Sequence, residues 1–177
     1  MVSVDDVKNL REETGAGVME CKKALAECEG DAKAAVVIIK ERGHLKAAEK
    51  SERTAREGLI EPYIHAGGKL GVLVEINCET DFVARNADFK AFAHEVAMHI
   101  AAACPRYVAE ADIPKAELKG LDKAEKASYI KENCLLAQSY IRDDSATVGQ
   151  LLTDIIAKTG ENIVINRFAR FVLGREG

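Results

Sequence analysis

One stretch, residues 78–86, constrains the fold of this chain more than any other because it joins two clear patterns. An alternating apolar run at residues 70–77 predicts a β-strand directly before it. A helix is predicted directly after it, over residues 87–103, with Asn86 or Asp88 as the N-cap. The stretch is therefore expected to form a strand-to-helix turn, where binding residues are often presented on a rigid support.

Thr80, Asp81 and Phe82 occupy this predicted turn. A plain turn usually contains Gly, Pro, Asn or Ser, so an apolar ring beside a carboxylate is unexpected there. The local pattern leaves two interpretations open. In the first, Asp81 caps the following helix and Phe82 folds back into the core, as a Phe in a small domain usually does. In the second, both side chains point outward and bind a partner.

The strand at residues 70–77 is expected to belong to a small sheet. Residues 58–65 predict a second strand, and the glycine-rich residues 66–69 predict the hairpin turn between the two. A long third strand is expected at residues 163–173. Together they predict an antiparallel sheet of about three strands with helices on one face. The core of the helix after the turn is expected to contain Phe89, Phe92, Val96 and Ile100.

The N-terminal part of the chain predicts three short helices, at about residues 4–14, 18–27 and 31–43. Ser3 followed by Asp6 is typical of a capping box at the first of them. The fold class is therefore α+β: a three-helix bundle followed by the small sheet. Apolar residues expected on the inner helix faces are Val4, Val7, Leu10, Ala35, Val36, Ile38 and Ile39.

Residues 40–56 carry six basic residues, interleaved with Glu41, Glu49 and Glu52. Mixed charges of this kind favour a solvated polar helix or linker. Contact with RNA is the alternative, although no aromatic residues interleave to stack on bases. Farther along, residues 114–141 are expected to be mostly helical, and Asp144-Ser145 is expected to cap a helix over residues 147–158.

Composition excludes several classes of protein. The net charge of −4 argues against a surface that binds nucleic acid throughout, and no apolar run approaches the roughly 20 residues of a membrane helix. The first residues lack the basic start and apolar segment of a signal peptide, so none is expected there. The five cysteines are widely spaced, which favours reduced thiols in the cytoplasm over a zinc site.

The chain also lacks the usual signs of an enzyme or a metalloprotein. Gly67-Gly68-Lys69 is not a phosphate-binding loop, because the spaced glycines and the following Ser or Thr are missing. His94 and His99 are five residues apart, which does not place two ligands on one helical face. No catalytic motif is present, so we expect no enzyme activity, no metal and no cofactor.

Three motifs, in the same order along the chain, resemble the elongation factor Ts family. The first is the run from Leu10 to Leu25, which contains Glu13-Thr14-Gly15-Ala16-Gly17-Val18-Met19. The second is Asn77-Cys78-Glu79-Thr80-Asp81-Phe82-Val83-Ala84-Arg85, and the third is Thr147-Val148-Gly149-Gln150-Leu151-Leu152 followed by Gly160-Glu161-Asn162-Ile163. Three long motifs in order are a far more specific signal than one alone.

The resemblance implies a guanine-nucleotide exchange factor that binds elongation factor Tu, both with GDP and without nucleotide, and disturbs its Mg²⁺ and phosphate site. It implies that Thr80, Asp81, Phe82 and Val83 make that contact. It also implies that the helical bundle is similar to a ubiquitin-associated module. The docking residues implied for this module are Arg11, Thr14, Gly15, Met19, Lys22 and Lys23.

The glycine-joined helices and the polar connector after them suggest an organisation into a module at residues 1–45, a polar basic linker at 46–57 and a core and dimerisation domain at 58–177. The segment 115–131 is shorter than the helical hairpin expected of the family. A coiled-coil insert and a second copy of the core hairpin, both present in longer members, are not recognisable. A homodimer would restore the second copy, so we expect two chains to pair, with neither a membrane nor nucleic acid as a direct partner.

Overall fold

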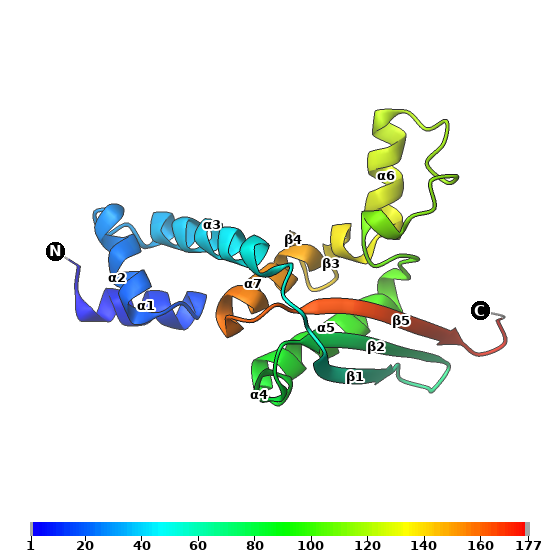
Figure 1. Cartoon of the computed structure of the whole chain (residues 1–177), viewed down its shortest axis with the longest axis horizontal. Helices are drawn as coiled ribbons and strands as arrows, with labels where there is room; N and C mark the ends of the chain where they lie inside the picture. Colours follow the sequence, from blue (N-terminus) through cyan, green and yellow to red (C-terminus); the bar gives the residue numbers. More distant parts are fainter. Residues whose placement is uncertain (1, 176–177) are drawn as a thin grey trace. The chain divides into compact units, whose positions relative to one another are not determined.

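The computed structural model describes residues 2–175, with every side chain in that range except those of His44 and Lys46. The chain folds as two compact units (Figure 1). The first consists of Met1–Arg53 and Thr153–Asn162, and the second of Thr54–Leu152 and Ile163–Gly177. The predicted α+β class is confirmed, with N-terminal helices followed by a small antiparallel sheet and further helices.

Three helices make up the N-terminal part of the first unit: α1 (Val4–Thr14), α2 (Val18–Glu27) and α3 (Ala32–Lys50). The predicted capping box at α1 is present: the Asp6 amide donates to Ser3 Oγ at 3.1 Å, and the Ser3 amide donates to the Asp6 carboxylate at 3.0 Å. The buried core of the three helices consists of Leu10, Cys21, Ala24, Leu25, Ala35 and Ile39.

Two expectations for these helices are wrong. The third helix does not end near Gly43 but continues to Lys50, because one interior glycine costs only about 1 kcal/mol relative to Ala and the following residues favour helix. Val4 is 84% exposed, although it was expected on the inner face. It is the first residue of α1, and the core begins one turn later, with Val7 and Leu10.

The sheet of the second unit has three antiparallel strands, as predicted, and their order is β1-β2-β5. They are β1 (Glu57–Ile64), β2 (Leu70–Cys78) and β5 (Val164–Val172). Helix α5 (Ala87–Ala103) covers one face (Figure 1). The residues of α5 that were predicted for the core are all buried: Phe89, Phe92, Val96 and Ile100. The residues of β2 that face α5 are buried as well: Val72, Val74, Ile76 and Cys78.

A β-bulge interrupts the pairing of β2 with β5. Glu75 pairs with Arg167 and Ile76 pairs with Ile165, so Asn166 is an extra residue. The Glu75 carboxylate accepts from Asn166 Nδ2 at 2.9 Å and from Arg167 Nε at 2.7 Å. Both hydrogen bonds lower the pKa of Glu75 below its usual value, and the bond from Asn166 has the larger effect. Glu75 therefore holds both residues of the bulge at the outer face.

Helix α5 is also held at its C-terminal end. Arg170, on β5, donates from Nε and Nη2 to the carbonyl oxygen of Ala101, at 3.2 and 3.1 Å. Carbonyls in the last turn of a helix have no partner within the helix, and a cation there is favoured by the helix dipole. The helix that follows the Asp81-Phe82 turn is thus tied to the sheet at its far end.

The segment after α5 is less helical than expected. Within residues 114–141 the structure has α6 (Lys123–Asn133), a short 3₁₀ turn η2 (Leu135–Ala137) and the strand β3 (Ser139–Tyr140). A second strand, β4 (Asp143–Thr147), pairs with β3, and another 3₁₀ turn, η1 (Glu110–Asp112), precedes Pro114. Helix α6 begins only at the Asp122 cap, which leaves the residues between Pro114 and Gly120 in turns.

The cap of α7 (Val148–Thr159) also differs from the expectation. Asp144-Ser145 lies in β4 rather than at the helix start. Thr147 serves instead: its Oγ1 accepts from the Gln150 amide at 3.2 Å, and its amide donates to Gln150 Oε1 at 2.7 Å. This is the reciprocal arrangement of a capping box, which the Thr-x-x-Gln spacing could have predicted.

A polar network around Glu117 organises the segment that carries α6. Arg106 donates to both carboxylate oxygens, at 3.1 and 3.2 Å, and Tyr107 donates to Oε1 at 2.8 Å. The Tyr129 hydroxyl donates to Oε2. Hydrogen bonding to Glu117 raises the pKa of Tyr129 to about 12, and the Tyr129 and Tyr107 donors lower the pKa of Glu117.

Candidate functional site: an exposed turn at the end of the central strand

The turn after β2 contains a single helical turn, α4 (Asp81–Ala84), before α5 begins. Thr80 is its N-cap and accepts the Val83 amide on Oγ1 at 3.4 Å. Asn86 caps α5 and accepts the Asp88 amide at 2.7 Å. Neither cap is Asp81, so the interpretation that Asp81 caps the following helix is wrong.

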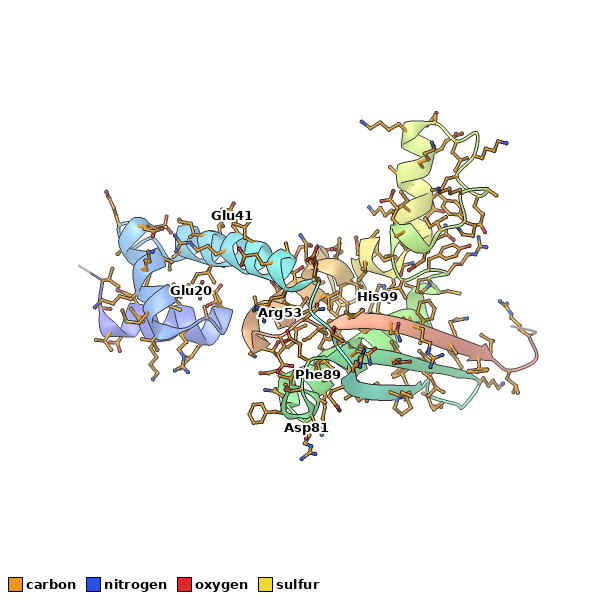
Figure 2. The ribbon with its side chains drawn as sticks, in the orientation of Figure 1. Glu20, Glu41, Arg53, Asp81, Phe89 and His99 are labelled. Carbon is orange, nitrogen blue, oxygen red and sulfur yellow. The ribbon has the colours of Figure 1, made fainter. Side chains whose placement is uncertain are left out.

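Adjacent side chains of α4 point in opposite directions. Phe82 is 79% exposed, whereas Val83 is 4% exposed. The interpretation that Phe82 folds into the core is therefore wrong, and Val83 is the residue that anchors the turn from inside. Figure 2 shows Asp81 on α4, at the periphery of the second unit. A large aromatic ring is therefore exposed to water beside a carboxylate.

Asp81 is paired within its own turn. Its carboxylate accepts from Arg85 Nη2 at 2.9 Å, with side chains that are 63% and 78% exposed. An exposed pair of this spacing is worth only about 0.3–0.5 kcal/mol, so a partner can break it at little cost. Sequence reasoning missed Arg85 as a member of the site, although its position four residues after Asp81 is the signal that could have found it.

The residues implied for docking lie on and between α1 and α2. Thr14 is half-buried, and its hydroxyl donates to the Leu10 carbonyl at 2.7 Å. Gly15 closes α1 with φ at +69°, a left-handed conformation that glycine adopts without strain. Val18, which was not expected here, is 49% exposed beside Met19 at 73%. The other implied docking residues are exposed as well: Arg11, Lys22 and Lys23.

The basic stretch at residues 40–56 is the last part of α3 and the loop after it. Arg42 is ion-paired with Glu27 of α2, which offsets one of the positive charges of this stretch. The Lys46 side chain lies outside the part that the structure describes. The alternative of RNA contact gains nothing from this arrangement, and it stays a prediction.

Two further features of the described part of the chain concern clusters of metal ligands and membrane-spanning helices. Among the described side chains, no group of three or more His, Cys, Asp or Glu residues is placed to hold a metal ion. No helix in the described part of the chain is long and apolar enough to span a bilayer. None of the five cysteines, all of which lie in the described part of the chain, forms a disulfide, and Cys21, Cys78 and Cys134 are buried.

His99 is buried for a structural reason. One ring nitrogen, Nε2, lies 3.0 Å from Gln138 Oε1, and Gln138 in turn donates to the Glu132 carbonyl at 2.7 Å. Burial lowers the pKa of His99, so the ring is neutral at pH 7. A neutral donor that joins α5 to the segment after α6 accounts for this residue without a catalytic role.

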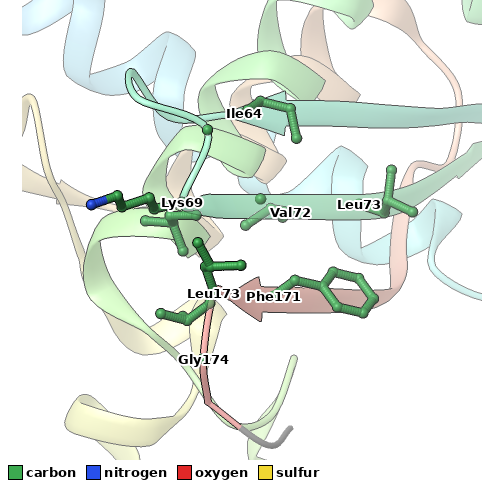
Figure 3. A pocket seen from close by; sticks show the side chains of 11 residues that line it. Ile64, Lys69, Val72, Leu73, Phe171, Leu173 and Gly174 are labelled. Carbon is green, nitrogen blue, oxygen red and sulfur yellow. The ribbon is translucent and has the colours of Figure 1, made fainter.

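The sheet face opposite α5 is apolar and uncovered within the second unit. Ile64, Leu73, Phe171 and Leu173 are 44–74% exposed. They line a groove of about 580 Å³ near the hairpin turn (Figure 3). We define the outer face as these four residues together with Ile60. A soluble monomer rarely leaves so many neighbouring apolar side chains in water unless they bind something.

Comparison with known proteins agrees with the motifs. The family model described as "Elongation factor TS" matches residues 4–128. The elongation factor Ts of Caldanaerobacter subterraneus subsp. tengcongensis is 50% identical, with 98% of each chain covered. Those of Thermoanaerobacter sp. and Heliobacterium modesticaldum are 49% and 48% identical over 98% of this chain, and 96% and 91% of their own length is covered.

These relatives are similar in length to the chain, which is therefore a short form. Each alignment spans 195 positions, more than the 177 residues here, so the relatives contain residues that this chain lacks. The family model covers most of the chain, and the relatives are about 50% identical over nearly all of it. The chain belongs to the elongation factor Ts family.

Proposed function

We propose that this translation elongation factor acts as a guanine-nucleotide exchange factor: it binds elongation factor Tu with GDP and promotes GDP release. The observation that carries the proposal is the outward direction of Phe82 beside Asp81, on a turn that is capped at Thr80 and anchored by Val83. Family membership supports it. The protein makes and breaks no covalent bond in this role, so it is not an enzyme in the ordinary sense.

The proposed mechanism is reciprocal linkage. A protein that binds the nucleotide-free GTPase more tightly than the GDP form must lower the affinity for GDP by the same factor. Phe82 would be buried only in the complex, and burying a Phe side chain is worth roughly 1.5–3 kcal/mol. Asp81 would add a negative charge that repels the nearby phosphate and competes with the GTPase's own ligands for Mg²⁺.

The helices α1–α3 would act as a docking module. Met19 and Val18 offer exposed apolar contact area, and Lys22 and Lys23 offer positive charge beside it. We retain the division into a module at residues 1–45, a linker at 46–57 and a core at 58–177 as part of the proposal. The first part of this linker, up to Lys50, is helical and forms the end of α3. The work of both parts belongs in the cytoplasm, where translation takes place.

We further propose that two chains pair through the outer face. The pairing partner that fits best is a second copy, because an apolar face that meets itself about a two-fold axis buries both copies at once. Glu75 and Arg167 at the edge of that face neutralise each other at 2.7 Å, so two copies approach without like-charge repulsion. Face-to-face packing of two sheets is a common architecture.

Release of fluorescent GDP from purified elongation factor Tu tests the exchange function. The release rate is measured by stopped flow at rising concentrations of this protein, with an excess of unlabelled GDP. The expected result is a rate that rises and saturates. A rate equal to spontaneous release at every concentration would reject the proposal. A gel shift with RNA over a salt series addresses the alternative, since RNA binding must weaken steeply as salt rises.

A further inference from the structure

The turn that carries Asp81 and Phe82 is fastened to the sheet through Thr80. The Thr80 carbonyl accepts from the Ala84 amide at 3.2 Å, and it also accepts from the Cys78 thiol, with Sγ at 3.1 Å. The Thr80 hydroxyl accepts from the Val83 amide. Thr80 therefore accepts three hydrogen bonds at the start of α4, and one of them comes from a side chain of β2.

Cys78 combines two properties that this place requires. It is the last residue of β2 and is fully buried, in the same inward row as Val74 and Ile76. A thiol packs as a small apolar group, yet it keeps a weak S–H donor. Alanine in this row would pack without donating, and serine would donate at a higher cost of desolvation.

We propose that Cys78 is a positioning residue for exchange, acting through Thr80 to fix the direction of Asp81 and Phe82. The inference rests on the proposed function. Phe82 is too exposed to be held by the chain's own core, so its direction follows from the backbone of the turn. A turn with a fixed direction loses less entropy on binding than a mobile one, and this favours insertion of the ring.

Cys78→Ala and Cys78→Ser separate this role from packing. Loss of one hydrogen bond corresponds to about 0.5–1.5 kcal/mol, so Cys78→Ala should lower the maximal GDP-release rate about two- to tenfold. Cys78→Ser should stay close to the wild type in this rate, although its melting temperature should be no higher than that of Cys78→Ala. Cys134→Ala removes another buried thiol and serves as the control for a general loss of core packing.

A second readout needs no partner. The chain contains no tryptophan, so Phe82→Trp places a single tryptophan fluorophore on the turn. Time-resolved anisotropy then reports local motion at residue 82. In this background, Cys78→Ala should increase the amplitude of fast local motion, whereas Cys78→Ser and Cys134→Ala should not.

The two readouts keep the inference distinct from the proposed function. If the wild type fails to accelerate GDP release, exchange is rejected, while the anisotropy still decides whether Cys78 fixes the turn. If Cys78→Ala matches the wild type in release and in anisotropy, the inference is wrong. It is also wrong if Cys78→Ser is as slow as Cys78→Ala and both losses follow melting temperature, because Cys78 would then serve packing alone.

Discussion

At the scale of single residues, Phe82 is the side chain for which partner binding and stability should separate. Phe82→Ala should slow GDP release by roughly one to two decades, because burial of the ring in the complex is worth roughly 1.5–3 kcal/mol. Its melting temperature should stay near that of the wild type, since the ring is 79% exposed. Exchange kinetics and calorimetry on one preparation measure both.

Phe89→Ala is the matched comparison, because Phe89 is the same residue type and is fully buried. That change should cost about 3–5 kcal/mol of stability. Val37→Ala, which truncates an exposed apolar residue of α3, controls for nonspecific effects on release. A large drop in melting temperature for Phe82→Ala would return Phe82 to the core and remove the wedge from the mechanism.

The Glu117 network predicts that the stability of the protein falls at both acid and alkaline pH. The pKa of Glu117 is lowered, so its contribution is present above about pH 4.5 and is lost as pH falls through the folded-state pKa. The pKa of Tyr129 is raised to about 12, so its contribution is present below about pH 10 and is lost between pH 10 and 12.

Glu117→Gln should therefore flatten both the acid and the alkaline limbs of a plot of urea midpoint against pH. Glu110→Gln changes an exposed carboxylate of the same segment and should leave both limbs in place. Equal slopes in the wild type and Glu117→Gln would mean that the network does not couple to folding.

The motif identified Asp81 and Phe82, but the sequence left their direction open. Phe82 and Val83 are adjacent apolar residues, so hydrophobic periodicity cannot tell which of them is buried. Only the geometry of the short helical turn decides this. Cys78 was beyond sequence reasoning for another reason. Its partner is a backbone carbonyl two residues away, and no side-chain pattern records a contact of that kind.

At the scale of elements, a segment was predictable where its own residues decide its structure. Helix α5 was predicted over its full length because it has an apolar period, a good cap at Asn86 and a proline soon after its end. The segment 114–141 was not, because its structure depends on residues outside it: Gln138 and Tyr140 contact His99 of α5, and Glu117 accepts hydrogen bonds from Arg106 and Tyr107. The pair β3–β4 is too short to leave an alternating pattern.

The N-terminal module should control affinity rather than the speed of release. Met19→Glu places a charge on the exposed apolar surface of α2 and should raise the concentration of protein at half-maximal release. The maximal rate should change little, because the Asp81-Phe82 turn is intact. Stopped-flow titrations at equal elongation factor Tu concentration give both quantities.

Val4→Glu is the control for added charge, because Val4 is also exposed but lies at the start of α1. Its titration should match the wild type. If Met19→Glu does so as well, the module has some role other than docking.

At the scale of the whole molecule, the outer face predicts self-association. Phe171→Glu should convert a dimer to a monomer, since two charges would be buried against each other without partners. Light scattering at micromolar concentration should give twice the chain mass for the wild type and the single mass for the variant. A wild type that is monomeric throughout would reject the pairing.

The bulge at Asn166 determines which residues of β5 reach the outer face, because it shifts the alternation of side chains by one position. Side chains alternate along a strand, so one extra residue reverses the assignment of everything beyond it. Ile165 can face the core while Phe171, an even number of positions later, faces outward. Deletion of residue 166 would therefore exchange the inward-facing and outward-facing residues of β5 on one side of the bulge. Such a deletion would scarcely alter the amino-acid composition, yet it would disturb the core and the outer face together. We therefore expect single-residue deletions not to be tolerated at this position.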